Sequence, residues 1–265
     1  MYNLFRADWR RMCKSRWLLV TSFGYIAALA CVYLILVCVF HPSVLPVLQG
    51  QGAVIDAAQW EELAGRTMLD FVYHILYDSN LWLSSVGISA GLFCLADYSD
   101  GAVKNILPIL GDAGPYLGAR ALSLLVLALV PQTAVFLFAI LCKPLTVFAD
   151  WGSPAGWAVL YLGGTLISWA VALCVQFLAL LLRREWSMAL AVVLLGSGMV
   201  AQLVSFLGVQ LGVPSLGHFT LYGLGRQVNP ELTLPACAVL AAACLVWGAL
   251  YSAAAHLVLA LRDSV

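Results

Sequence analysis

Long blocks of apolar residues decide what this chain can fold into. They run to about 20 residues or more, the length at which an α-helix crosses the hydrocarbon core of a bilayer. Lipid offers no hydrogen bonds to a polypeptide backbone, so each block is expected to be helical. The composition agrees, because 63% of the residues are hydrophobic and only 10% are charged. The sequence therefore predicts an all-α, polytopic membrane protein that forms a single domain over residues 1–265.

We predict six transmembrane helices along the chain. The six spans are Trp17–Phe40, Leu69–Ala96, Ala121–Leu141, Trp157–Leu182, Ser187–Leu211 and Pro235–Leu261. Placing the N-terminus inside puts ten of the thirteen basic residues on the cytoplasmic side and leaves Arg66, Lys143 and Arg226 outside. Lys and Arg are enriched in cytoplasmic loops, so both termini are expected to be cytoplasmic.

An interfacial helix is predicted over residues 1–16. Arg6, Arg10 and Lys14 recur every four residues on one face, while Phe5 and Trp9 lie on another. Such a helix lies in the headgroup plane, with its apolar face toward the acyl chains and its basic face toward anionic lipid. A signal peptide is the alternative, but the apolar run that follows is too long for one and no A-x-A site comes after it.

The most polar interruption on the predicted cytoplasmic side runs from Asp97 to Arg120, and we call it the inter-span segment. We expect a short amphipathic helix in it, capped by Ser99 and ended or kinked by Pro108. Its apolar stripe at helical spacing consists of Val103, Ile106, Leu107 and Leu110. A charged helix between two spans suits the docking of a soluble partner, and a plain solvated loop is the alternative.

A second unusual stretch, residues 212–234, is punctuated by Gly and Pro and yet is half apolar. We expect it to form a re-entrant or interfacial segment at the outer surface.

Several kinds of chemistry lack their motifs in this sequence. There is no Walker A motif for ATP and no Cys/His cluster for a metal, and equal numbers of acids and bases give no reason to expect nucleic-acid binding. The predicted span centres hold almost no ionisable residues, unlike those of ion-driven carriers. Their main polar residues are Gln132, Gln176 and Gln202, which we interpret as helix-bridging groups.

One motif typical of enzymes is present. Residues Gly87–Gly91 match the G-x-S-x-G nucleophile elbow, with Ser89 as nucleophile and His256 as a candidate base. The elbow requires a strand–turn–helix context, whereas these residues lie inside a predicted span. The same glycines form a small-residue face for close helix contact, which we favour.

The order of these elements resembles an ABC-2-type transporter permease. The local resemblance is in LADYSDGAVKNILPILGDAGPYLGAR, where an acid and a Gly precede a Lys-Asn-Ile helix and a base opens the next span. The N-terminal MYNLFRADWRRMCKSRW also resembles the small bacterial permeases of peptide-antibiotic (lantibiotic) export and immunity systems. The chain departs from the family after the helix, where Asp112, Gly114 and Pro115 replace the usual bases.

The resemblance implies a permease of a bacterial plasma membrane, with no catalytic residue and no cofactor of its own. A separate ATP-binding subunit, in two copies, would hold ATP and magnesium and dock on the inter-span segment. A second permease, identical or paired, would complete the path. The implied docking residues are Asp97, Tyr98, Asp100, Gly101, Lys104, Asn105 and Arg120. Candidate helix-packing or dimer residues are Gly87, Gly91, Gly208 and Gly212.

The function expected from this resemblance is ATP-driven export of a hydrophobic or amphipathic substrate, such as a peptide, antibiotic or lipid. An intramembrane enzyme of the serine protease type and a secondary transporter are the alternatives.

Overall fold

The computed structural model describes residues 2–15, 24, 26–27, 29–35, 50, 66–78, 81–99, 106, 108–142 and 150–263. These residues are almost entirely helical, and the one β-bridge among them joins Thr67 to Asp150. Three helices are long and apolar enough to cross a membrane without interruption: α8 (Gly114–Cys142), α9 (Pro154–Leu182) and α13 (Leu234–Asp263). The prediction of an all-α protein with several membrane-length helices is confirmed.

Two further predicted spans are bent pairs of helices instead of continuous ones. The second span consists of α5 (Met68–Val72), the π-helix η1 (Tyr73–Asp78) and α6 (Leu81–Ser99), with a 55° bend before α6. The fifth consists of α10 (Glu185–Gly196) and α11 (Met199–Gln210), which meet at 58°. Gly198 lies at this second break with φ 75°, a left-handed conformation that glycine adopts without steric cost. Counting each pair as one span gives five.

The first expected span, Trp17–Phe40, falls largely outside the described residues, and those of its residues that are described (24, 26–27 and 29–35) are helical. The N-terminal helix α1 (Tyr2–Lys14) lies within residues 1–16, where a helix was predicted, and its position at a membrane interface stays a prediction. The predicted outer segment contains a 3₁₀ helix, η3 (Pro214–Phe219), and the short helix α12 (Leu221–Gln227), whose N-cap is Thr220.

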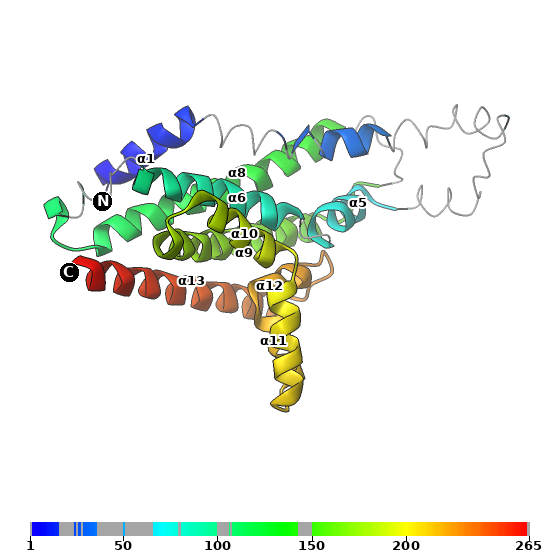
Figure 1. Cartoon of the computed structure of the whole chain (residues 1–265). Coiled ribbons are helices and arrows are strands. Elements are labelled where there is room, and N and C mark those ends of the chain that lie inside the picture. Colours follow the sequence, from blue (N-terminus) through cyan, green and yellow to red (C-terminus); the bar gives the residue numbers. More distant parts are fainter. Residues whose placement is uncertain are drawn as a thin grey trace.

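Helix α9 is the centre of the bundle and packs against α13, α6 and α8. Its most apolar stretch is 67% buried, against 17% for α13, so α13 lies at the periphery. Figure 1 shows these helices running side by side, with both termini at the same end, while α11 projects away from the bundle. Helix α11 packs mainly against η3, and most of its large apolar side chains are exposed.

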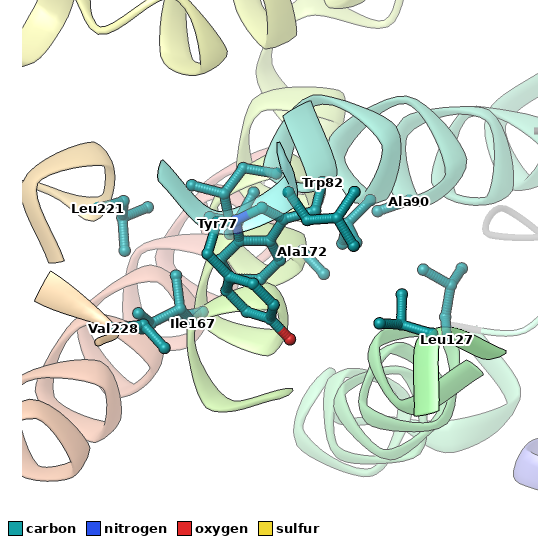
Figure 2. Packing of buried hydrophobic residues seen from close by; sticks show 14 of the residues in the cluster. Tyr77, Trp82, Ala90, Leu127, Ile167, Ala172, Leu221 and Val228 are labelled. Atoms are coloured by element: carbon teal, nitrogen blue, oxygen red, sulfur yellow. The ribbon is translucent and has the colours of Figure 1, made fainter. Parts of the chain in front are cut away.

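The main core lies between α6, α8 and α9 and is closed by the outer segment. Figure 2 shows the rings of Tyr77 and Trp82 beside each other in this core, with centroids 5.0 Å apart. The Tyr77 hydroxyl donates a hydrogen bond to the Gln132 side chain and lies 3.2 Å from the Leu160 carbonyl oxygen. These polar contacts join the second, third and fourth expected spans, as the interpretation of Gln132 as a bridging group requires.

Candidate functional site

The two ends of the inter-span segment are joined by an ion pair. Asp97 lies in the last turn of α6 and Arg120 lies in the second turn of α8. Their side chains form a salt bridge, and the Tyr116 hydroxyl donates a hydrogen bond of 2.9 Å to Asp97 Oδ2. The segment therefore leaves and re-enters the bundle at one point.

Helix α1 adds a second acid and a second base to this point. Asp8 Oδ1 lies 3.0 Å from Arg120 Nη1, and Arg11 forms a salt bridge with Asp97. Ser123 Oγ also donates a hydrogen bond of 3.1 Å to Asp8 Oδ2. We call Asp8, Arg11, Asp97 and Arg120 the charge cluster. Its formal charge is zero, and it links α1, α6 and α8.

The charge cluster is buried where these three helices meet. The side chains of Asp97 and Arg120 are each only 2% exposed, and the Arg120 guanidinium lies 4.3 Å from the centre of the Phe93 ring. A buried charge that loses its partner typically destabilises a protein by about 3–5 kcal/mol. The cluster therefore holds the three helices in one arrangement.

The described middle of the inter-span segment has an inner and an outer side. Ile106 and Leu110 pack on a small apolar cluster that is separate from the main core. Ile109 lies between them in sequence and is 84% exposed. The cluster beneath consists of Ala113, Tyr116, Leu117, Leu180, Ala255 and Leu259, from the segment itself, α8, α9 and α13. A force on the exposed side would therefore be passed to three membrane-length helices.

A turn at Gly111, with φ 67°, ends this stretch and leads into Asp112. Asp112 Oδ1 accepts a hydrogen bond of 3.1 Å from the Gly114 backbone and lies 3.4 Å from Nε2 of His256 in α13. The Gly114 N–H, followed by His256, lowers the pKa of Asp112 because both favour the carboxylate. The turn is thus tied to the last helix of the bundle by the contact between Asp112 and His256.

The structure describes three of the seven predicted docking residues, Asp97, Tyr98 and Arg120. Asp97 and Arg120 come together, but both are buried inside the chain and neither side chain is open to a second protein. Tyr98 and Ser99 lie in the last turn of α6, and Ser99 is the last residue of that helix. Residues 108–110 are helical, so the helix does not end at Pro108 but continues to the turn at Gly111. Asp100, Gly101, Lys104 and Asn105 lie outside the described residues.

The residues predicted for the interfacial helix divide between two faces. Arg6, Trp9, Arg10 and Lys14 are exposed, and Phe5 is half-buried. The expected apolar face does not lie wholly outward, because Met12 is buried against the chain.

Sequence reasoning missed three residues of this site. Asp8 is the one acid in an otherwise basic helix, and this exception was the available signal for a buried partner. Arg11 lies three residues further along, on the same side of the helix as Asp8. Ile109 is adjacent to the predicted apolar stripe but outside it, and only its exposure distinguishes it.

Three of the four glycines predicted to serve helix packing or a dimer contact, Gly87, Gly91 and Gly208, are packed against other parts of the same chain. A Cβ on Gly87 would lie 2.9 Å from Val192 Cγ1, and one on Gly91 would lie 3.2 Å from Met188 Cγ, both in α10. A Cβ on Gly208 would lie 2.6 Å from the carbonyl oxygen of Val213. Gly212 has φ 76° with open space beside it, so it serves a turn.

The candidate nucleophile elbow has no turn. Residues 87–91 lie inside the continuous helix α6, and Ser89 is buried there. His256 contacts Asp112 at the far end of α13. Among the described residues, no three His, Cys, Asp or Glu side chains are grouped so that they could hold a metal ion.

Comparison with known proteins gave no match to a family model, to a curated protein or to a solved structure.

Proposed function

We propose that this protein is the membrane-spanning permease subunit of an ATP-driven exporter of the ABC-2 type. In this proposal the inter-span segment is cytoplasmic and docks on a separate ATP-binding subunit. The observation that carries the proposal is the form of the segment, which combines an exposed apolar tip with an inner side packed on the helix bundle.

Ile109 is the centre of the proposed docking surface. A large apolar side chain that is 84% exposed at the predicted water-facing end of a bundle gains from burial by a partner. Full burial of an isoleucine is worth about 1.5–3 kcal/mol, or roughly one to two orders of magnitude in affinity. Pro108 precedes it and fixes the backbone on the approach to this tip.

The inner side of the segment supports transmission of movement. Ile106 and Leu110 contact the apolar cluster shared by α8, α9 and α13, and Asp112 contacts His256. Closure of two ATP-binding subunits would therefore move α8, α9 and α13 together through the inter-span segment.

The absence of a Walker A motif from the sequence is the reason for a separate energy source. The partner would bind ATP and Mg²⁺ and would be present in two copies. Two permeases, identical or paired, would form one path, because a single bundle is filled by its own side chains at α9. The proposed cargo is hydrophobic or amphipathic, a class that includes peptides, antibiotics and lipids.

The proposal predicts that Ile109→Asp releases the ATP-binding subunit. The tagged full-length protein is purified from native membranes in a mild detergent, and the co-purified subunit is identified by mass spectrometry and by its Walker A motif. We expect at least an approximately tenfold lower recovery with Ile109→Asp, because the substitution places a carboxylate in an apolar contact.

Leu234→Asp is the matched control, since Leu234 is 85% exposed at the other end of α13. This variant should recover the subunit as the wild type does. Equal losses in both variants, or no ATP-binding subunit with the wild type, would contradict the proposal.

A further inference from the structure

Helix α1 presents two chemically distinct sides. Asp8, Arg11 and Met12 lie on the side that packs on α6 and α8, and Met12 is only 5% exposed. The single acid of the helix is therefore used inside the protein.

The outward side of α1 carries unbalanced positive charge beside aromatic rings. Arg6, Arg10 and Lys14 are exposed at intervals of four residues, which aligns them along one side of the helix. Tyr2 and Trp9 are also outward, with 74% and 46% of their surfaces exposed. Aromatic and basic side chains together at the end of a membrane-length bundle match the interface of a leaflet that contains anionic phospholipid.

The inward side of α1 contacts both ends of the inter-span segment. Arg11 pairs with Asp97 at its beginning, and Asp8 pairs with Arg120 at its end. Asp97 and Arg120 are almost fully buried, whereas Arg11 remains 34% exposed, so the charge cluster opens to the surroundings on the α1 side. Displacing α1 would break two ion pairs and expose the charges that hold the segment's ends together.

We propose that α1 is a positioning element controlled by anionic lipid. Phospholipid headgroups bind Arg6, Arg10 and Lys14, and Asp8 and Arg11 transmit the resulting position of α1 to both ends of the inter-span segment. Each basic residue near an anionic surface is worth about fivefold in binding, so the three together give an effect of about a hundredfold. This mechanism requires no ATP-binding subunit, so it stands or fails separately from the proposed transport function.

Hydrogen–deuterium exchange of the full-length protein in nanodiscs tests both steps. One set of discs contains phosphatidylcholine alone, and the other also contains phosphatidylglycerol. In the wild type we expect phosphatidylglycerol to slow exchange in α1 and also in residues 108–113. The triple variant Arg6→Gln/Arg10→Gln/Lys14→Gln should lose the lipid effect in both places.

A second variant separates lipid binding by α1 from transmission of the position of α1 to the inter-span segment. Asp8→Asn/Arg11→Gln leaves the outward bases in place, so the lipid effect should persist in α1 and disappear from residues 108–113. Arg11→Lys retains the charge and should behave as the wild type. Arg183→Gln/Arg184→Gln removes two bases from the α9–α10 turn and should leave both effects intact.

Three outcomes would overturn the proposal. They are an absence of any phosphatidylglycerol effect on α1 in the wild type, an effect that survives in the triple variant, and an unchanged response of residues 108–113 when Asp8 and Arg11 are replaced. Protection of α1 that arises only when an ATP-binding subunit is added would assign the basic side to protein docking instead.

Discussion

At the scale of single residues, close packing around Gly164 supports a polar bridge between helices. A Cβ at this position would lie 2.9 Å from the Tyr77 hydroxyl oxygen and 2.9 Å from Gln132 Nε2. The hydrogen bond from Tyr77 to Gln132 therefore depends on the missing side chain of a third helix. Polar bridges of this kind specify which helices become neighbours in a membrane, where apolar surfaces alone discriminate poorly.

We expect Gly164→Ala to destabilise the protein by about 1–3 kcal/mol, the usual cost of overpacking a core. The neighbouring Gly163→Ala is the control, because its Cβ would lie an ordinary 3.4 Å from the nearest atom, Val228 Cγ1. This control should be neutral, or stabilising by up to about 1 kcal/mol through better helix propensity. Thermal unfolding in detergent measures both, and equal stabilities would show that the bridge does not depend on Gly164.

The sequence singled out Asp97 and Arg120, but it did not indicate their pairing. Both were expected to face a partner because they match positions of the docking segment in the family that the sequence resembles. Their actual neighbours lie far away in the chain, since Arg11 precedes Asp97 by 86 residues and Asp8 precedes Arg120 by 112. Local spacing carries no information about such a contact, which arises only when helices pack.

At the scale of elements, the continuous helices were predicted best. The ends of α9 and α13 differ from the expected spans by no more than three residues. Apolar length is a local signal, which explains this accuracy, whereas α8 begins at Gly114, seven residues before its expected start at Ala121. The bends in the second and fifth spans were missed, because a π-helix leaves no mark in hydropathy and a glycine within an apolar run also suits close packing.

The break between α10 and α11 should depend on Gly198. Alanine there would adopt a left-handed conformation, at a cost of roughly 1–2 kcal/mol, and its Cβ would lie 2.6 Å from the Tyr222 ring. Gly212→Ala is the matched control, since its φ of 76° is almost the same and no atom lies within 4 Å. We expect Gly198→Ala to lower the unfolding free energy by a further 1–3 kcal/mol or so compared with this control. Denaturation of the two variants side by side measures this difference. Similar losses of unfolding free energy in both would mean that the Tyr222 ring moves aside without a cost in stability.

At the scale of the whole molecule, the elements that supply the charge cluster meet at one end of the bundle. Figure 1 shows α1, the last turns of α6, the start of α8 and both termini at that end. The peripheral helix α13 and the projecting α11 both expose many large apolar side chains. Hydropathy alone predicted a bundle of this kind, but not which helix would be central.

The distribution of basic residues predicts the orientation of this bundle. A fusion of alkaline phosphatase after Val265 should be inactive, because the enzyme folds only outside the cytoplasm, whereas an insertion at Glu231 should be active. A fluorescent-protein fusion at the C-terminus should fluoresce and so provide the complementary signal. The reverse pattern would place the inter-span segment outside the cell, away from any ATP-binding subunit.

The charge cluster also has a consequence for how the chain is synthesised. Asp8 and Arg11 leave the ribosome first, Asp97 follows at the end of α6, and Arg120 arrives last with α8. Until α8 enters the membrane, two carboxylates share a single guanidinium at the edge of the lipid. In a stalled or truncated chain the charge cluster thus has one carboxylate without a guanidinium, an excess negative charge that the finished cluster does not have.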